Sequence, residues 1–392
     1  MSSPKFIFIE SNTSGTGELL LYKAREKNLI PVFITSNPKK YVFLPIENLN
    51  VVVLNTDDRN VLLNAILQID NVHGVYSSSD YFIETASWLA KMLKLPGTRS
   101  QTVKICRNKN QFYEAISAGE FNIPQTTCFS DESAAIASAT LSFPVVIKPS
   151  NASGSVGVKL CQKEEDAKKH IQFLYENSHE VVIQEYVEGD EFSVEVCTFR
   201  GQNYILGITK KYLSEFPYFI ETGHDFPAIL TKDNENNIKE TVNRLLSFLN
   251  FDFGFCHIEL KIKKEKIVII EVNPRLAGGM IPVLIQTAAG LDVLGLLLDI
   301  YAGKPVTLKT QYNGFSSIRH VIGKKSGKIK MLSYHGPIVD EIKFSKKAGE
   351  DFTVHGDFRD RVAYLICCDK NADICIKKAN DAIKDFIVYI EN

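Results

Sequence analysis

This sequence of 392 residues lacks the long apolar segment that a membrane-spanning helix requires. The apolar stretch 290–303 is interrupted by Asp292 and Asp299, and the run at 6–9 is too short for a signal peptide. An excess of one charge is also missing, because 45 Lys and Arg stand against 46 Asp and Glu. Such a balance gives no bulk attraction to nucleic acids or anionic membranes. We therefore expect no nucleic-acid partner and no membrane partner.

Paired cysteine motifs are missing as well. The sequence has eight cysteines but no Cys-x-x-Cys, and Cys197, Cys256, Cys367 and Cys368 lie in apolar runs. This placement predicts buried, reduced thiols and a cytoplasmic protein. The adjacent pair Cys367 and Cys368 leaves a redox role open, although two packed thiols are favoured.

The chain is too long for one small core, so roughly two to four structural units are expected. Residues 4–95 alternate β-rich runs with helical patterns, which predicts a parallel, doubly wound sheet. Residues 12–17 lack the third glycine of a dinucleotide fingerprint, so a tight turn is favoured there. We expect one helical stretch at 281–301 and a helix at 372–390. The predicted boundaries are an N-terminal unit at 1–97, a helical linker at 98–125, further units at 126–200 and 201–310, and a C-terminal α+β unit at 311–392.

Glu271 and Asn273 lie two residues apart at the end of an apolar run. Side chains two apart on a strand share a face, so both oxygens can reach one hard cation such as Mg²⁺. The alternative is a strand end with ordinary polar residues. Pro274 ends the strand, and Arg275 follows as a permanent cation suited to a phosphate or an oxyanion.

The β-rich runs 256–262 and 266–273 are joined by a short polar turn, which predicts a hairpin. A turn with an odd number of residues places Glu259 opposite Glu271 on the same face. An even-numbered turn places Glu259 opposite Ile270, facing away. Because opposed carboxylates repel each other unless a cation binds both, Glu259, Glu271 and Asn273 form a candidate divalent-metal site.

Lys148 ends a second apolar run and is followed by small residues that include Gly154 and Gly157. Such a loop can turn several N–H groups toward one anion, and the lysine adds a cation. The segment is not a Walker A loop, and by itself a flexible turn beside a surface lysine is favoured. The polar segment 184–191 has carboxylates that can accept hydrogen bonds from ribose hydroxyls, but its composition alone indicates a solvated turn.

Taken in order, these segments resemble the ATP-grasp superfamily. The matching features are Lys109, the lysine before a glycine-rich loop, the linker QEYVEGDEF at 184–192, and then Glu and Glu-x-Asn on paired strands. The resemblance covers about residues 1–310. It implies an α/β and α+β protein with the ATP-grasp fold: an N-terminal doubly wound parallel-sheet domain, a small lid domain, a central antiparallel-sheet domain and a C-terminal α+β extension.

The resemblance also implies that the protein uses ATP with two Mg²⁺ ions, for which Mn²⁺ can substitute. The ATP phosphates would be contacted by Lys109, Lys148 and the loop residues Ser153, Gly154, Ser155 and Gly157. The adenine would be lined by Gln184, Glu185 and Val187, and the ribose held by Glu191. The metal ligands would be Glu259, Glu271 and Asn273.

Within the superfamily, the segments EVNPRLAGG at 271–279 and FIETGHDFP at 219–227 look most like the dipeptide-forming L-amino-acid ligases. The resemblance implies that Glu221 meets a substrate ammonium and that His224 lies near the reacting carboxyl. The D-alanine–D-alanine ligases carry a catalytic arginine on the first metal strand, a neighbourhood that reads Cys256-His257 here. Arg275 would serve instead, together with the backbone N–H groups of the catalytic loop residues Gly278 and Gly279.

These features imply an ATP-dependent carboxylate–amine ligase that forms an amide through an acylphosphate, with an amino acid as a substrate. Its partners would be small-molecule carboxylate and amine substrates, and a homodimer is common among relatives. Two alternatives stay open: an ATP-dependent carboxylase of the biotin-carboxylase type or another metabolic ligase, and a non-catalytic ATP-binding regulatory protein.

Overall fold

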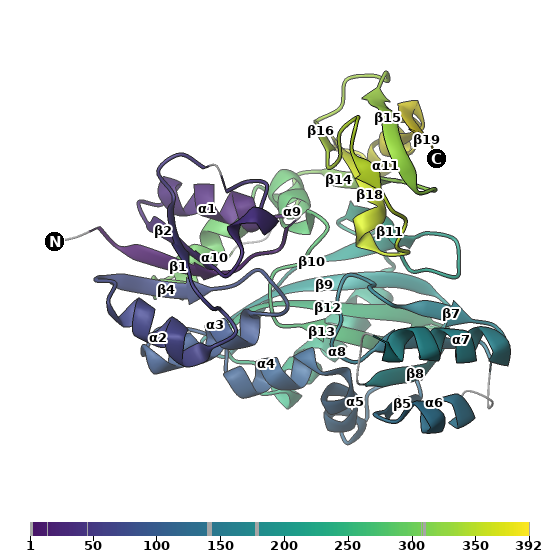
Figure 1. Ribbon diagram of the computed structural model, residues 1–392, viewed down its shortest axis with the longest axis horizontal. Helices are drawn as coiled ribbons and strands as arrows, with labels where there is room; N and C mark the ends of the chain where they lie inside the picture. The colour runs from purple at the N-terminus through teal and green to yellow at the C-terminus, as the bar shows by residue number, and fades with distance from the viewer. Residues whose placement is uncertain are drawn as a thin grey trace.

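Figure 1 shows the computed structural model of the protein, which describes residues 3–391 apart from 14, 45, 139–142, 177–179, 307, 309 and 310. Within these residues the named strands form four sheets. The largest sheet lies at the centre of Figure 1, with the N-terminal sheet at the left, the lid sheet at the lower right and the C-terminal sheet at the upper right.

The N-terminal sheet is parallel, with the strand order β3-β2-β1-β4. Phe6 and Phe8 of β1 pack on the side of α1, whereas Ile7 and Ile9 pack on the side of α2 and α3. Both faces are therefore covered, as expected for a doubly wound sheet. The elements are β1 (Lys5–Ile9), α1 (Gly17–Glu26), β2 (Ile30–Thr35), η1 (Pro38–Lys40), β3 (Asn50–Val53), α2 (Arg59–Leu67), β4 (Val72–Tyr76) and α3 (Ile83–Met92).

The first strand-to-helix turn is closed by a side chain of the chain itself. Asn12 Oδ1 accepts the N–H of Gly17 at 3.0 Å. A Cβ at position 17 would lie only 1.9 Å from Ser11 Oγ, so the turn leaves no room for a larger residue. This is the tight turn that the sequence favoured.

Two short helices lead to the lid sheet, which has the strand order β5-β8-β6-β7. The Asn108 side chain caps the second helix by accepting the N–H of Gln111. The elements are α4 (Ser100–Arg107), α5 (Lys109–Ser117), β5 (Thr126–Phe129), α6 (Glu132–Ser138), β6 (Val145–Pro149), β7 (Lys159–Cys161), α7 (Glu164–Tyr175) and β8 (Val181–Glu185). The predicted lid unit 126–200 extends too far, because β9 (Asp190–Phe199) pairs with β10 and β12 in the largest sheet.

The largest sheet has eight antiparallel strands in the order β13-β12-β9-β10-β11-β14-β18-β16. Along β12, Ile258 and Leu260 are buried in the cluster that includes residues of α8, whereas His257 and Glu259 lie on the opposite face. This alternation puts a polar surface on the site side of the sheet. The further elements are β10 (Gln202–Leu213), β11 (Glu221–Phe226), α8 (Lys232–Phe248), β12 (Gly254–Lys263), β13 (Lys266–Asn273), β14 (Phe315–Ile322), β16 (Glu341–Phe344) and β18 (Arg361–Asp369).

The helical stretch predicted at 281–301 is two helices, α9 (Ile281–Ala289) and α10 (Val293–Tyr301). Gly290 ends α9 with a left-handed φ of 64°, and Asp292 caps α10 by accepting the N–H of Gly295. No single helix in the described part of the chain is long and apolar enough to cross a membrane. Only α9 and α10 taken together reach that length and composition, and they are bent by 108° at the break between them.

The C-terminal residues complete the large sheet and add a small one. Strands β14, β18 and β16 extend the largest sheet, while β15 (Gly327–Tyr334), β17 (Asp351–Phe352) and β19 (Phe386–Glu391) form a sheet of their own. The helix predicted at 372–390 is wrong beyond α11 (Ala372–Ala382), because the β-branched and aromatic segment 386–390 pairs with β15. Two short turns, η2 (Phe358–Asp360) and η3 (Ile383–Asp385), flank these elements.

Candidate active site

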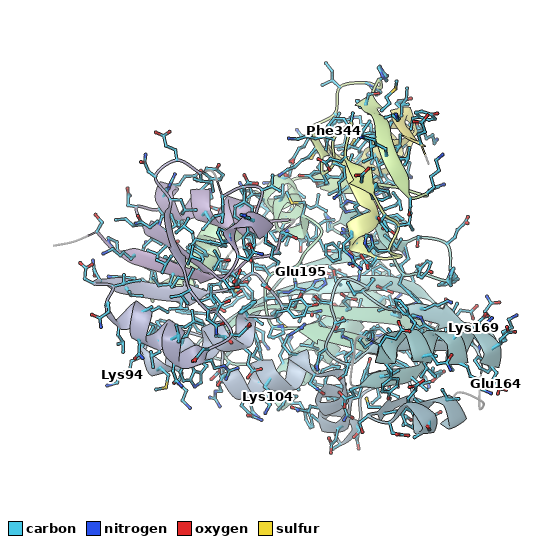
Figure 2. All side chains as sticks on the ribbon, viewed as in Figure 1. Lys94, Lys104, Glu164, Lys169, Glu195 and Phe344 are labelled. Atoms are coloured by element: carbon cyan, nitrogen blue, oxygen red, sulfur yellow. The ribbon has the colours of Figure 1, made fainter. Side chains whose placement is uncertain are left out.

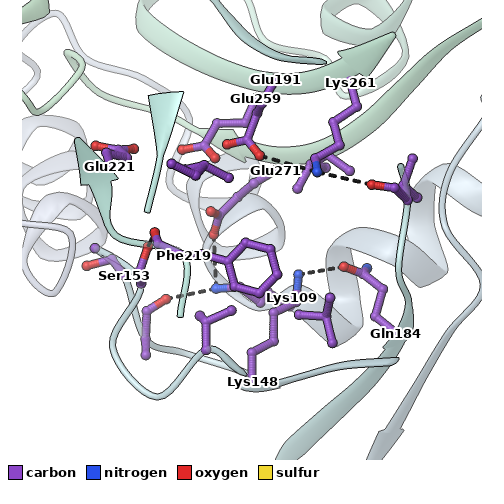
Figure 3. Close-up of a pocket in the computed structure, with 18 of the residues that line it drawn as sticks. Lys109, Lys148, Ser153, Gln184, Glu191, Phe219, Glu221, Glu259, Lys261 and Glu271 are labelled. Atoms are coloured by element: carbon purple, nitrogen blue, oxygen red, sulfur yellow. Dashed lines mark hydrogen bonds and ion pairs between the residues drawn. The ribbon is translucent and has the colours of Figure 1, made fainter. Parts of the chain in front are cut away.

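A cavity between the lid sheet, the loop after β6 and the largest sheet gathers most of the predicted site residues (Figure 3). It contains about 850 Å³ of space, including the part open to solvent. The predicted residues that line it are Lys109, Lys148, Ser153, Gly154, Ser155, Gln184, Glu185, Val187, Glu191, Glu221, Glu259 and Glu271. The predicted residues outside its lining are Gly157, His224, Asn273, Arg275, Gly278 and Gly279.

The β12–β13 hairpin places Glu259 directly opposite Glu271. Its turn has two residues, Lys264 and Glu265, both with positive φ (47° and 66°), which matches the twist of a tight hairpin. An even-numbered turn alone would oppose Glu259 to Ile270. The register shifts by one residue next to Glu259, so that Ile270 forms a β-bulge and the two carboxylates still face each other.

Lys109 and Lys148 enter the cavity from outside the largest sheet. Lys109 Nζ lies 2.9 Å from Glu271 Oε1 and donates to Ala152 O at 2.8 Å. Lys148 Nζ donates to Gln184 Oε1 at 2.9 Å. Burial, together with the nearby Lys109 ammonium, lowers the pKa of Lys148 to about 8. An anion beside Lys148 would remove this penalty, as expected of a phosphate site.

Lys211 of β10 is a site residue that the sequence analysis missed. Its Nζ lies 2.9 Å from Glu191, 3.0 Å from Glu221 and 2.9 Å from Glu259. Burial acts to lower the pKa of Lys211, but the three carboxylates raise it well above its usual value. One ammonium therefore connects the predicted ribose, substrate and metal positions. Only the pairing of four strands brings these residues together.

Lys261 is a second missed lysine, and here a signal was available. It follows Glu259 by two residues on β12, so the two-residue period of a strand places both on the same face. Lys261 Nζ donates to Val187 O at 3.0 Å and lies 3.7 Å from Glu191 (Figure 3). Lys261 therefore holds the backbone at Val187, a residue expected to line the adenine.

Behind Glu259 lies a buried histidine with a carboxylate on each side. His257 Nδ1 is 3.0 Å from Glu195, and His257 Nε2 is 3.2 Å from Glu259. Burial acts to lower the pKa of His257, but Glu195 and Glu259 raise it to about 10. Glu195 lies near the middle of the molecule in Figure 2 and also accepts a hydrogen bond from Ser193 at 2.8 Å. The imidazolium therefore holds the Glu259 carboxylate in place.

The glycine-rich loop after β6 is held from two sides. Gly154, Ser155 and Gly157 have left-handed φ angles of 66°, 64° and 70°. Ser155 Oγ donates to Phe219 O at 2.7 Å on one side of the loop. Gly157 lines a second cavity between α7 and residues 355–359, and its carbonyl lies 2.9 Å from His170 Nε2.

Glu221, His224 and Gly279 meet beside the cavity, although only Glu221 lines it. Glu221 Oε2 accepts a hydrogen bond from Arg361 at 2.7 Å, in addition to its contact with Lys211. His224 is fully buried, its ring nitrogens have no hydrogen-bond partner, and its Nε2 lies 3.5 Å from Glu221. A Cβ on Gly279 would come within 2.5 Å of the imidazole, so the loop packs directly on this ring.

Arg275 does not line the cavity in this structure. Its guanidinium makes two hydrogen bonds to Asp80, at 2.7 Å and 2.5 Å, and a third to Leu276 O. Asp80 follows β4 of the N-terminal sheet and also pairs with Arg107 at 3.1 Å. The predicted oxyanion donor is therefore engaged in an ion pair that the sequence did not reveal.

The acidic side chains fit a cation that arrives with a phosphate ligand. Glu259 and Glu271 both line the cavity, while Asn273 pairs with His257 across the strands and is 3% exposed. No group of three or more His, Cys, Asp and Glu in the described residues is placed to hold a metal by itself. Magnesium is commonly held by one or two carboxylates with phosphate oxygens and water completing its shell. The carboxylate pair meets that requirement.

Comparison with known proteins identifies similar sequences and structures. Residues 141–283 match the family model described as ATP-grasp domain. The protein named Uncharacterized protein y4rH from Sinorhizobium fredii (strain NBRC 101917 / NGR234) is 26% identical over 399 residues, which covers 97% of this chain and 82% of that protein.

Two solved structures cover all of this chain and all of their own. An L-amino acid ligase from Bacillus licheniformis has a TM-score of 0.86 at 19% identity. A phosphoribosylglycinamide synthetase from Anaerococcus prevotii has a TM-score of 0.74 at 17% identity. The biotin carboxylase domain of a Hydrogenobacter thermophilus 2-oxoglutarate carboxylase, in complex with MgADP, ADP and bicarbonate, has a TM-score of 0.75 at 14% identity and covers 100% of this chain and 92% of its own. At such low sequence identities, the structural similarity shows the fold alone.

Proposed function

This chain is a member of the ATP-grasp superfamily, and from that premise we propose that it is an ADP-forming carboxylate–amine ligase with an amino acid as a substrate. The resemblance of residues 219–227 and 271–279 to the L-amino-acid ligases supports the amino acid. The similarity of the whole chain to the Bacillus licheniformis ligase structure agrees with that choice.

The observation that carries the proposal is the pair of opposed glutamates at the end of a lysine-rich cavity. Glu259 and Glu271 face each other across β12 and β13, and Lys109 and Lys211 contact one of them each. Like charges directly opposed on a sheet are unfavourable without cations. We propose that two Mg²⁺ ions, or Mn²⁺ in their place, are held by Glu259, Glu271 and Asn273 when ATP binds.

The charge of the cavity suits a magnesium-balanced nucleotide. Its lining has five glutamates (Glu185, Glu191, Glu221, Glu259 and Glu271) and four lysines (Lys109, Lys148, Lys211 and Lys261), a difference of one negative charge. A site with so little net charge favours a ligand whose own charge is largely neutralised. MgATP meets this condition, and it would supply the γ-phosphoryl group and neutralise charge during its transfer.

We propose that a substrate carboxylate takes the γ-phosphoryl group to give an acylphosphate and ADP. The amine of the second substrate then displaces phosphate and forms the amide. Lys109 and Lys148 would hold the phosphates, and the loop at 153–157 would exclude water from the acylphosphate. The N–H groups of Gly278 and Gly279 would bind the oxyanion, and Arg275 would have to leave Asp80 to join them.

The amine must lose a proton, and Glu221 and His224 are the two candidate acceptors, of which only Glu221 lines the cavity. Glu221 already contacts Lys211 and Arg361, so its charge is compensated. The His224 nitrogens have no hydrogen-bond partner and adjoin the loop at Gly279. Proton transfer to His224 needs no existing ion pair to break.

The direct test is to incubate the protein with ATP, Mg²⁺ and all twenty amino acids and to identify the products by mass spectrometry. Dipeptides or other amides with matching amounts of ADP and phosphate support the ligase. ADP release that depends on bicarbonate instead would indicate a carboxylase. Nucleotide binding without turnover under any of these conditions would indicate a regulatory protein and contradict the proposal.

The glutamate pair is tested by Glu271→Ala. We expect loss of Mg²⁺-dependent ADP formation by at least about 10²-fold, because a phosphate-bound cation loses a ligand. The matched control is Glu265→Ala, which removes an exposed glutamate from the turn of the same hairpin and should leave turnover unchanged. Normal turnover by a folded Glu271→Ala protein would refute the metal assignment.

A further inference from the structure

The C-terminal unit reaches over the lid and touches the glycine-rich loop at Gly154. The N–H of Phe358 donates to Gly154 O at 3.3 Å. The Phe358 ring packs on the Gly154 Cα, since a Cβ at position 154 would lie 2.6 Å from Phe358 Cδ1. Residue 154 must therefore be glycine for this contact to exist. Phe358 is separated from Gly154 by about two hundred residues of sequence, so no local pattern indicates the contact.

The segment that carries Phe358 is fixed within the C-terminal unit. Asp360 is fully buried and accepts the N–H groups of His355 and Gly356 at 2.8 Å and 2.7 Å. Asp357, 1% exposed, accepts two hydrogen bonds from the Arg359 guanidinium. Two buried carboxylates thus shape the segment into a short, rigid turn. These four hydrogen bonds are all made within residues 355–360.

The same segment continues into the substrate side of the cavity. Arg361 follows Phe358 by three residues and donates to Glu221 Oε2 at 2.7 Å and to Glu221 O at 3.1 Å. One short stretch of chain therefore contacts the phosphate-side loop through Phe358 and Glu221 through Arg361. A movement of the glycine-rich loop would displace Phe358, and a movement of Glu221 would displace Arg361, three residues further along the chain.

We propose that Phe358 is a positioning residue that holds the glycine-rich loop in the position seen here and, through Arg361 on the same turn, couples the loop to Glu221. The role of the loop in covering a nucleotide rests on the proposed function, but the contact between Phe358 and the loop does not. Without the ring, the loop keeps the Ser155 contact to Phe219 O and the backbone hydrogen bond from Phe358 to Gly154 O, but loses the packing of the ring on Gly154. It should then open more often.

The test is hydrogen–deuterium exchange of the full-length protein, measured by mass spectrometry on peptides that cover residues 151–158. Phe358→Ala is compared with Phe358→Leu, which keeps an apolar contact, and with Phe344→Ala as the matched control. Phe344 belongs to the same C-terminal unit, is 41% exposed, and its ring meets that of Phe386. Each variant is measured alone and with Mg²⁺ and a non-hydrolysable ATP analogue.

We expect exchange of the loop amides to be about tenfold faster in Phe358→Ala, the scale set by loss of one partly buried ring. Phe358→Leu should lie near the wild type, and Phe344→Ala should match it. Peptides of the N-terminal sheet should not change in any variant. The analogue should also dissociate about tenfold faster from Phe358→Ala.

Unchanged loop exchange in a folded Phe358→Ala protein would overturn the proposal, as would an equal increase in Phe344→Ala. Should Phe358→Ala give no cooperative melt, Phe358→Gln takes its place, because its side chain has similar reach but cannot pack as a ring. Failure of the wild type to bind the analogue would refute the nucleotide site and not this contact, since the nucleotide-free exchange measurement still decides the role of Phe358.

Discussion

Buried lysines with different partners set the electrostatics of the cavity. Lys211 contacts three carboxylates and stays charged, whereas the closest partner of Lys148 is the neutral side chain of Gln184. The pKa of Lys148 is lowered to about 8 by burial and by Lys109. Two lysines in one cavity can therefore respond differently to pH and to a bound anion.

Nucleotide binding should be linked to protonation of Lys148. A phosphate beside it favours the charged form, so binding near pH 8 should take up part of a proton, and affinity should fall as pH rises above 8. Calorimetry in buffers of different ionisation enthalpy measures this uptake. Lys148→Met should bind at least about tenfold more weakly without proton uptake, whereas Lys169→Met, at an exposed lid lysine, should behave as wild type. Equal uptake in Lys148→Met would exclude this residue as the source.

The same pKa affects folding stability with a defined sign. Because the pKa of Lys148 is below that of an unfolded lysine, the unfolded chain binds more protons between about pH 8 and pH 10.5. The contribution of Lys148 to stability therefore rises with pH across that window. Below pH 8 the buried charge reduces stability unless an anion is bound.

At the scale of elements, the β12–β13 hairpin combines two irregular features. Its two-residue turn would direct Glu259 away from Glu271, and the bulge at Ile270 reverses that outcome. The turn also holds two non-glycine residues in the left-handed region, which is unfavourable for residues with a Cβ. The hairpin therefore keeps Glu259 opposite Glu271, although its turn is strained.

Replacing Glu265 with glycine should relieve this strain. We expect Glu265→Gly to increase the free energy of unfolding by about 0.5–1 kcal/mol. Glycine removes the backbone strain of a Cβ at φ 66°, and this gain exceeds the extra conformational entropy that glycine gives to the unfolded chain. Urea denaturation measures the change. Glu265→Ala keeps the Cβ and should give no increase, so an equal gain in both variants would show that the turn is not the source.

At the scale of the whole molecule, buried ion pairs hold the N-terminal sheet against the site. Asp80, which follows β4, binds Arg275 of the segment 271–279 and Arg107 of helix α4. Burial acts to raise the pKa of Asp80, but Arg275 and then Arg107 lower it to about 2. Its contribution to stability is fully present above about pH 4 and is lost as pH falls toward 2.

Removing both partners of this pair should cost less stability than the two single removals added together. We expect Arg275→Met to lower the free energy of unfolding by about 3 kcal/mol at pH 7, because Asp80 stays buried with fewer partners. The double variant Asp80→Asn with Arg275→Met should lose less than the sum of the single variants. Denaturation of the four proteins at pH 7 gives the coupling, and additive losses would contradict the interaction.

Sequence patterns predicted those parts of the fold that depend on local periodicity. The parallel N-terminal sheet and the β12–β13 hairpin each follow from a run of neighbouring residues. The cavity position of Lys148 does not, because its neighbours alone favoured a surface lysine beside a flexible turn. The predicted helix at 372–390 was wrong after Ala382, because pairing with β15 turns the last segment into β19. The predicted lid unit was too long, because β9 belongs to a sheet whose other strands lie far away in the sequence.

The amino-acid sequence by itself determined which chemical groups this protein carries and which of them share a face of one strand, because strand periodicity acts over a few residues. Only the tertiary structure decided which groups meet. The contacts of Lys211 with three glutamates, of Arg275 with Asp80 and of Phe358 with Gly154 join segments far apart in the chain. Such contacts depend on how sheets pack and on where a single bulge shifts the register, and neither is encoded in any short stretch of residues.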